Sequence, residues 1–544
     1  MAAPQVPAEL VWVATITMGR VWRWASSDVE LQVAGVTVDV RWGLETDEQV
    51  EQLGAQSAPP TIAFPWPGTV RELLDHAEQA TAELALVPVD AHGVAEWTRR
   101  LVVAGGRVRD VEIDPLTRVA SVQLDSPEQL DTADLCQPSY AVSRRTWPLA
   151  AEATWGARVP FVYGAPGSFA FATLTDTDLG VAYDYTEPEW WLTPTLVVAR
   201  ETRTTGATPA LPIDVELMSV DLPMPDGTTE HLGDLPLWPR FLAACQGWGS
   251  ATAATLWVKN ADVGWTVRDV ELVRAFDGLG QPVTLIPLPD TFSRKAGEWW
   301  IGWTEGGPLT GQLGALVAEV LRRSSVQVDW TSVLTAASWL DRYRLGGYVD
   351  DSITPVQWVT DRLKLFGVSV RWGTGGLELV LDHGPADPVA RLEVGVDATR
   401  AGPLKVSAAE ADQVVVTWAA NRGADRRQIR TVVRRLGAVG ARVEELSAAE
   451  VWDEATAIGV AREALETHGP TRELVLSVAT AAWWWLRAAD VVHLVDADIG
   501  ADGPWRVVAV RHSTNALRQI TVREVVDQAV VVASGDDTEG EAGR

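Results

Sequence analysis

The stretch LVWVATITMGRVWRW, Leu10–Trp24, decides the class of the N-terminal region. Its side chains alternate along the chain, which is typical of a β-strand with one buried face. Shorter strands are predicted at Val29–Val33 and Val36–Trp42, with Gly35 at the turn between them, and another at Val119–Leu124. We therefore expect a small β-barrel or curled sheet at this end of the chain.

Two further patterns lie within this region. A helix is predicted at about Val70–Leu86, with apolar residues at helical spacing. A hairpin is predicted from Leu101 to Ile113, because Gly105-Gly106 can supply the positive φ angles of a two-residue turn. The N-terminal barrel is therefore expected to carry one helix.

The clearest pattern of the chain lies between Pro308 and Leu381. Apolar residues from Leu313 to Leu321 form the stripe of an amphipathic helix, and Asp329 is predicted to cap a second helix. Thr354-Pro355-Val356-Gln357 combines a cap, a proline at the first helical position and a capping box. This third helix is expected to end at Phe366-Gly367, before a hairpin with a Gly-Thr-Gly-Gly turn.

The last quarter is predicted to return to β-structure. Gln413–Trp418 and Ile429–Arg435 are expected strands, and a capping box at Ser447–Glu450 is expected to open a helix that His468-Gly469-Pro470 closes. A strand meander is expected to follow, from Arg472 to Val525. The weaker patterns from about Cys136 to Pro308 indicate a β-rich, irregular region with many Pro and Gly residues.

The predicted fold class is mostly β with α+β parts, in several domains. At roughly 100–200 residues per domain, 544 residues give about three to four domains. We expect them at the following positions: an N-terminal β-barrel at 1–135, an irregular β-rich domain at 136–307, an α+β domain at 308–400, a C-terminal β-barrel at 401–530 and a disordered acidic tail at 531–544.

The net charge of the chain limits the kinds of partner that it can bind. The net charge is −28, from 45 basic and 73 acidic residues. Such a surface disfavours sequence-independent nucleic-acid binding and adsorption to anionic membranes. The longest uncharged apolar run, Leu474–Leu486, is too short to cross a bilayer, and the N-terminus lacks the pattern of a secretory signal. We expect a protein made in the cytoplasm, without stable membrane insertion.

No catalytic or metal-binding motif is found in the sequence. Cys136 and Cys245 are too few for a zinc site or a disulfide framework and are expected to be buried, and the seven His residues are scattered singly. The segment from Asp496 to Gly503 partly resembles a calcium loop, but its spacing favours a turn between strands. We therefore expect no enzyme activity, no cofactor and no metal.

One basic cluster stands out on this acidic chain. Its six guanidinium groups belong to Arg422, Arg426, Arg427, Arg430, Arg434 and Arg435. Two interpretations remain open: a solvated hairpin balanced by Glu444 and Glu445, or an interface that docks an acidic partner. The 27 Trp residues likewise fit either a GC-rich genome or anchors at interfaces.

Three stretches together resemble the baseplate hub, or tail-tip hub, proteins of tailed bacteriophages. The first is Arg158-Val-Pro-Phe-Val-Tyr-Gly-Ala-Pro-Gly167, preceded by Val142–Trp147; the second runs from Val328 to Asp382 and contains Tyr348-Val-Asp-Asp-Ser-Ile-Thr-Pro-Val-Gln-Trp358. The third joins Ala489–Val492 to Arg506–Val508, and it departs from the hub pattern because Ala489 stands where hubs usually have Gly.

This resemblance implies a structural virion protein at the distal end of a non-contractile tail. Three copies are implied to form a ring of six barrels that joins the tail tube or distal tail ring to the central fibre or tip proteins, in contact with the tape measure protein. The ring is implied to form part of the genome-ejection channel, in which an acidic lumen repels passing DNA.

Two alternatives remain open at this stage. The first is a tail-associated protein that binds or cleaves glycans, with Glu187, Glu189 and Glu298 beside Trp pairs as the candidate carboxylates. The second is a receptor-binding adhesin without enzyme activity, which predicts exposed Trp clusters and no tube-like barrels.

Overall fold

The structure is a computed structural model, and it describes most of the two ends and the centre of the chain. The described residues are 7–46, 49–52, 60–69, 71, 75, 77, 80–125, 131–136, 161–163, 311–349, 352–382, 387–418, 429–436, 442–451, 453–526 and 530–533, together with strand backbone between 167 and 306. The fold is mostly β with α+β parts, in several sheets, which confirms the predicted fold class.

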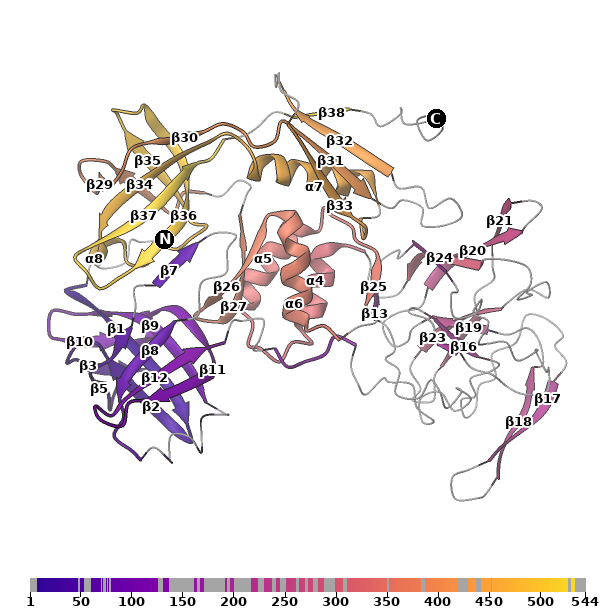
Figure 1. The fold of residues 1–544 in the computed structure, drawn as a ribbon, viewed down its shortest axis with the longest axis horizontal. Coiled ribbons are helices and arrows are strands. Elements are labelled where there is room, and N and C mark those ends of the chain that lie inside the picture. Colours follow the sequence, from indigo (N-terminus) through magenta and orange to yellow (C-terminus); the bar gives the residue numbers. More distant parts are fainter. Residues whose placement is uncertain are drawn as a thin grey trace.

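The N-terminal sheet has eleven strands and lies at the lower left of Figure 1. Its strands are β1 (Glu9–Met18), β2 (Arg20–Ala25), β3 (Glu30–Val33), β4 (Val36–Val38), β5 (Arg41–Trp42), β6 (Glu45–Thr46), β8 (Thr61–Pro65), β9 (Thr81–Val89), β10 (Val94–Glu96), β11 (Leu101–Ile113) and β12 (Val119–Leu124), with the 3-10 helix η1 (Trp97–Arg99). Gly19 and Gly35 have positive φ angles at the β1–β2 and β3–β4 turns, as the sequence predicts for Gly35. Trp24 packs on Phe64 within the core, with ring centroids 4.2 Å apart.

The predicted helix at Val70–Leu86 is wrong from Thr81 onward, because β9 begins there. This strand lies between β1 and β11 and is buried on both faces. Leu84 and Leu86 belong to one hydrophobic cluster, whereas Ala85 and Val87 belong to another. A strand buried on both faces has a nearly continuous apolar sequence, which cannot be distinguished from a buried helix by periodicity.

The predicted hairpin at Leu101–Ile113 is also wrong, because these residues form the single strand β11. Its first half pairs with β9 and its second half with β12, so the strand connects two parts of the sheet. Gly105 is in extended backbone, and a Cβ there would collide with the indole of Trp372. The glycine therefore serves close packing against a distant hairpin, and makes no turn.

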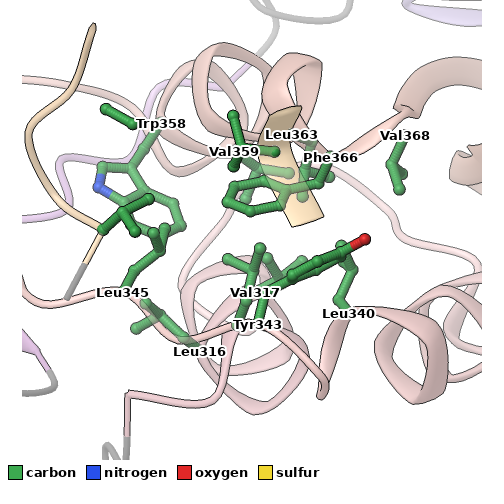
Figure 2. Close-up of a cluster of buried hydrophobic side chains, with 14 of the residues drawn as sticks. Leu316, Val317, Leu340, Tyr343, Leu345, Trp358, Val359, Leu363, Phe366 and Val368 are labelled. Atoms are coloured by element: carbon green, nitrogen blue, oxygen red, sulfur yellow. The ribbon is translucent and has the colours of Figure 1, made fainter. Parts of the chain in front are cut away.

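Three helices and a hairpin form the centre of the molecule, as predicted. They are α4 (Leu313–Leu321), α5 (Trp330–Leu340) and α6 (Pro355–Leu363), followed by the 3-10 helix η6 (Lys364–Phe366) and strands β26 (Val368–Gly373) and β27 (Gly376–Leu381). Asp329 accepts a hydrogen bond from the Thr331 amide at 2.9 Å, and Thr354 accepts one from Gln357 at 3.2 Å. Figure 2 shows the shared core, where Tyr343 packs against Phe366 with ring centroids 4.8 Å apart.

A four-stranded sheet lies beside this helical centre, and one helix, α7 (Glu454–Thr467), packs between the two. The strand order is β33-β31-β32-β38, formed by β33 (Val443–Ala448), β31 (Gln413–Trp418), β32 (Ile429–Arg435) and β38 (Val530–Ala533), and α7 packs on β31 and β32. The predicted helix start at Ser447–Glu450 is wrong. Ser447 lies within β33 instead, and Asp453 caps α7 by accepting from the Thr456 amide at 2.9 Å.

The C-terminal sheet lies above the N-terminal sheet in Figure 1. It contains β28 (Ala390–Glu393), β29 (Ala398–Arg400), β30 (Lys405–Ser407), β34 (Thr471–Ala479), β35 (Val491–Asp496), β36 (Ala501–His512) and β37 (Leu517–Glu524), with the short helix α8 (Thr480–Trp483). Its eighth strand, β7 (Gln49–Gln52), comes from the N-terminal region and pairs with β36. The two end regions are therefore joined by a shared sheet.

The central and C-terminal parts of the chain have separate hydrophobic cores. Residues 411–465 share one core with the three helices, whereas Leu392 and Ala398 share the C-terminal core with β34–β37. If the domains are divided by their hydrophobic cores, the described residues of 411–465 belong with the three helices. The expected boundary at residue 400 separates them from these helices. The strand β38 extends three residues into the segment expected as a tail, and 534–544 lie outside the described residues.

The middle region is described as strand backbone. Two short strands, β13 (Phe161–Tyr163) and β25 (Gly347–Val349), pair with each other at the edge of the helical centre. The others are β14 (Gly167–Ala170), β15 (Trp191–Leu192), β16 (Leu196–Ala199), β17 (Leu217–Pro223), β18 (Thr229–Pro236), β19 (Phe241–Ala244), β20 (Ala251–Asn260), β21 (Gly264–Asp269), β22 (Val273–Phe276), β23 (Pro282–Pro287) and β24 (Trp299–Gly306). Within the described residues, no helix has the length and apolar composition that crossing a bilayer requires.

Candidate functional site: a buried ionic junction and an arginine-bearing sheet

Glu51 lies at the centre of the contact between the two end regions. Its strand β7 is the edge strand added to β36, and its side chain is 9% exposed. One carboxylate oxygen accepts from the Ala488 amide at 3.1 Å and from Arg371 Nη1 at 3.4 Å. The other oxygen lies 3.1 Å from both Arg487 Nε and His512 Nε2. One acid therefore binds groups from three distant parts of the chain.

A second carboxylate completes this cluster. Glu378, on β27, lies 2.8 Å from Arg371 Nε and 3.5 Å from Arg487 Nη1. Arg487 also donates to the Trp372 carbonyl at 2.8 Å. We call Glu51, Arg371, Glu378, Arg487 and His512 the ionic junction. Because each guanidinium lies between two carboxylates, the charges of this buried group compensate one another.

The pKa shifts agree with this pairing. Burial by itself raises the pKa of Glu51, but Arg487, the hydrogen bond from His512 and Arg371 outweigh burial and hold that pKa well below its usual range. Burial lowers the pKa of His512, so its imidazole is neutral at pH 7 and donates from Nε2 to Glu51. Glu51 thus stays ionised, which the two arginines require.

Arg518 holds the segment that presents Arg487. Its buried guanidinium, on β37, donates to the carbonyls of Trp484 and Leu486 at 3.2 Å each, and to that of Trp483. Burial lowers its pKa to about 10, so the group remains charged at neutral pH. The turn after α8 is therefore fixed by the C-terminal sheet.

The arginine cluster predicted from the sequence lies apart from this junction. Arg430, Arg434 and Arg435 are on β32, and Arg422, Arg426 and Arg427 lie outside the described residues. Side chains alternate along a strand. Arg435 faces α7, where it donates to the Leu465 carbonyl at 3.0 Å and burial lowers its pKa. Arg430 and Arg434 face the opposite side of the sheet and are exposed.

The segments that carry the hub resemblance meet in space. Tyr163 of the first segment packs edge-on against Trp358 of the second, with ring centroids 5.4 Å apart. Gly347 lies under the Tyr163 ring, where a Cβ would collide with it. Ala489 of the third segment has a φ of 76°, a conformation that favours glycine. The alanine therefore has a backbone conformation that glycine adopts more readily.

Asp131 connects the linker after the N-terminal sheet to the helical centre. Its buried carboxylate accepts from the amide and hydroxyl of Ser325, both at 2.9 Å, and from the Val356 amide at 3.0 Å. Val356 lies in the first turn of α6, whose free amides favour a carboxylate. Sequence reasoning missed Asp131 and Glu51, since an isolated acid carries no signal of a partner hundreds of residues away.

The other sequence candidates give no reactive site in the described residues. Cys136 is buried, as expected, and its Sγ lies 3.0 Å from the Val349 carbonyl oxygen. The described residues do not include the other candidates, Cys245, Glu187, Glu189 and Glu298. Asp496–Gly503 includes the predicted turn between β35 and β36, and Arg400 binds Asp496 and Asp498 there. Among the described residues, no group of three or more His, Cys, Asp or Glu side chains could hold a metal ion.

Comparison with known protein families identifies one part of the chain. Residues 354–510 match a family model described as "putative phage tail protein". The matched segment begins at the cap of α6 and ends within β36. It includes Arg371, Glu378 and Arg487 of the ionic junction, and Glu51 and His512 lie outside it. No curated protein matches the sequence.

Several solved structures are similar to this chain over large parts of their own length. The 43 kDa tail protein of prophage MuSo2 from Shewanella oneidensis is 11% identical, with 57% of this chain and 97% of that chain covered and a TM-score of 0.28. The virion of a native gene transfer agent particle contains a chain that is 11% identical, with 72% and 91% covered and a TM-score of 0.36. Prophage tail protein gp18 from Listeria monocytogenes is 10% identical, with 54% and 91% covered and a TM-score of 0.24.

Proposed function

We propose that this chain is a structural protein of a phage virion, a homotrimeric hub at the distal end of the tail. The family match over residues 354–510 supports the role in a tail. The observation that carries the finer proposal is β7, which places a strand from the N-terminal region in the C-terminal sheet and buries Glu51 among arginines. A hub must hold its two end regions in one fixed arrangement, and this shared sheet supplies it.

In this proposal three copies form a ring that presents six barrel-like sheets to the tail tube or distal tail ring. The tape measure protein reaches the ring from above, and the central fibre or tip proteins bind below it. The ring lines part of the genome-ejection channel, and its net charge of −28 per chain repels the passing DNA. The protein is made in the host cytoplasm and then assembled into the virion.

The hub acts by rigid support rather than by chemistry. The carboxylates of the ionic junction are paired with guanidinium groups, so they serve to fix the contact between end regions. Breaking one partner of such a buried pair costs about 3–5 kcal/mol. Neither glycan binding nor glycan cleavage gains support from the described residues, and we propose no enzyme activity.

The exposed arginines of β32 supply a second element of the proposal. Arg430 and Arg434 are exposed on a strongly acidic chain, and Arg422, Arg426 and Arg427 precede them in the sequence, outside the described residues. Guanidinium groups pair well with carboxylates at interfaces. We propose that this surface docks an acidic surface of another tail protein; Arg435, which is directed toward α7, supports the sheet itself.

Mass photometry of the purified chain tests this function. We expect a species of about three times the chain mass of 58.9 kDa, and the same chain in purified virions at three copies for each tail. A stable monomer that is absent from virions would overturn the proposal. Particles that hold the chain in another symmetry, such as a ring of six, would overturn the trimer and leave the tail role.

A further inference from the structure

Two connections between the C-terminal sheet and the four-stranded sheet meet at His468. Residues 408–412 lead from β30 of the C-terminal sheet into β31, and residues 468–470 lead from α7 into β34 (Figure 1). The backbone carbonyl of His468 accepts hydrogen bonds from the Glu410 amide at 2.8 Å and from the Ala411 amide at 3.3 Å. Because the two sheets belong to separate hydrophobic cores, contacts between these connections help to fix one sheet relative to the other.

The His468 side chain has a carboxylate at each of its two ring nitrogens. Nδ1 lies 2.9 Å from Glu410 Oε2, and Nε2 lies 3.2 Å from Glu444 Oε2, on β33. Glu410 belongs to the first connection and Glu444 to the four-stranded sheet, so one imidazole joins three segments of the chain. The imidazole is 31% exposed, and it can therefore exchange protons with solvent.

Only the doubly protonated ring satisfies both carboxylates. An imidazolium has two N–H donors, whereas a neutral imidazole has one and directs a lone pair from its other nitrogen. In either neutral tautomer, one carboxylate therefore faces a lone pair. The hydrogen bond with His468 lowers the pKa of Glu410 below its usual value, so this acid is ionised at neutral pH. His468 is also the C-cap of α7, where the helix dipole favours a cation.

Most of the other charged groups around this contact have partners of their own. Arg523, on β37, lies 2.7 Å from Glu473. Arg442 lies 3.0 Å from Asp412. Among the described residues, no other cation pairs with either carboxylate of the contact. The charged groups on the surrounding elements are Lys405 (β30), Asp412, Arg435 (β32), Arg442, Glu466 (α7), Glu473 (β34) and Arg523.

We propose that His468 is a pH-sensitive lock between the C-terminal sheet and the four-stranded sheet. When protonated, its imidazole donates to Glu410 and Glu444 and holds the two connections together. When the ring loses its proton, one of these contacts is lost and the connections separate more often. The lock is therefore closed at acidic pH and loosens as the pH rises through the range in which histidine titrates. It does not depend on the proposed role in a tail.

Hydrogen–deuterium exchange of the purified full chain, measured by mass spectrometry, tests the lock. The amides of Glu410 and Ala411 report on it, because both bind the His468 carbonyl. After correction for the intrinsic exchange rate, we expect their protection to fall about threefold or more between about pH 5.5 and pH 8. The direction follows from the proton that the closed contact holds.

Variants of the lock separate it from other titrating groups. H468R is charged at both pH values and should remain protected, whereas H468Q should be weakly protected at both. E444Q places an amide that can donate to the neutral ring, so it should reduce the pH dependence. H493Q, at a second histidine that faces the single acid Asp502 at 2.7 Å, is the matched control and should behave as the wild type.

Three results would overturn the proposal. The first is equal protection of the wild type at the two pH values. The second is a loss of protection in H468R as large as that of the wild type. The third is an H493Q variant that loses the pH dependence, because the titrating group would then lie elsewhere. Mass photometry reports on the proposed hub separately, so the two proposals can fail independently.

Discussion

Arginine has different roles in the ionic junction and on the outer face of the four-stranded sheet, which is the face opposite α7. At the junction, Arg487 is 9% exposed and lies between two carboxylates and a carbonyl. On the outer face, Arg430 is 46% exposed and shares one exposed acid. A buried guanidinium whose three nitrogens each donate a hydrogen bond fixes two regions together. An exposed one contributes little to folding and is available for a partner.

Removal of the Glu51 carboxylate from the ionic junction should give the largest change in unfolding free energy. E51A removes one of the two carboxylates that Arg371 and Arg487 share and leaves one acid, Glu378, for two buried guanidinium groups. We expect a loss of about 3–5 kcal/mol of unfolding free energy. Urea denaturation measures it. E112Q, at an exposed position of β11, is the matched control and should change stability by less than about 0.5 kcal/mol. Equal effects of the two variants would show that the junction does not hold the end regions.

The next prediction concerns Glu463, a buried acid on α7. Burial and the nearby Glu466 raise the pKa of Glu463 on α7 from 4.5 to about 7, and Tyr343 donates to its carboxylate at 3.0 Å. Because the folded protein holds this proton more tightly than the unfolded chain, the stability is present below pH 4.5 and is lost as pH rises through 7.

The wild type should therefore lose about 2–3 kcal/mol of unfolding free energy between pH 5 and pH 8 through this group. E463Q should flatten that dependence, which urea denaturation at several pH values measures. Asp382, whose pKa burial raises to about 6, contributes in the same direction, so some slope remains. An unchanged slope in E463Q would contradict the assignment.

Gly105 tests the close contact between the N-terminal sheet and the hairpin next to the junction. G105A places a methyl group against Trp372 and should cost about 1–3 kcal/mol. G503A, at a strand position with open space around its Cβ, is the matched control and should not destabilise the protein. Thermal unfolding measures both. A neutral G105A would mean that the hairpin is free to move away from β11.

A smaller gain is expected beside the junction at Ala489. Its positive φ strains a side chain that has a Cβ, so A489G should stabilise the protein by about 0.5–1 kcal/mol after the entropy of the unfolded glycine is subtracted. A488G, at a buried position before it, is the control and should destabilise. Loss of stability in A489G would show that the alanine methyl group packs favourably there.

The smallest effect on folding should come from the outer face. R434Q removes an exposed guanidinium that is bound to Gln413, and we expect a change within about 0.5 kcal/mol. Its effect should appear in binding of an acidic partner instead. A loss of stability as large as that of E51A would remove the distinction between the two regions.

The sequence predicted those elements whose signals are local. Caps at Asp329 and Thr354 and the glycine at the end of η6 marked the helices of the centre, and Gly35 marked a turn. β9 was mistaken for a helix because it is buried on both faces, and Gly105 for a turn because its contact, Trp372, is remote. The junction had no local signal, since Glu51 and His512 are 461 residues apart.

An electron cryo-microscopy map of the assembled tail tip tests the central claim most directly. The account predicts three copies of this chain around the tail axis, each with its N-terminal and C-terminal sheets side by side in one ring and β7 in place between them. A map in which the two sheets of one copy belong to separate rings, or in which the chain is absent from the tail axis, would contradict it.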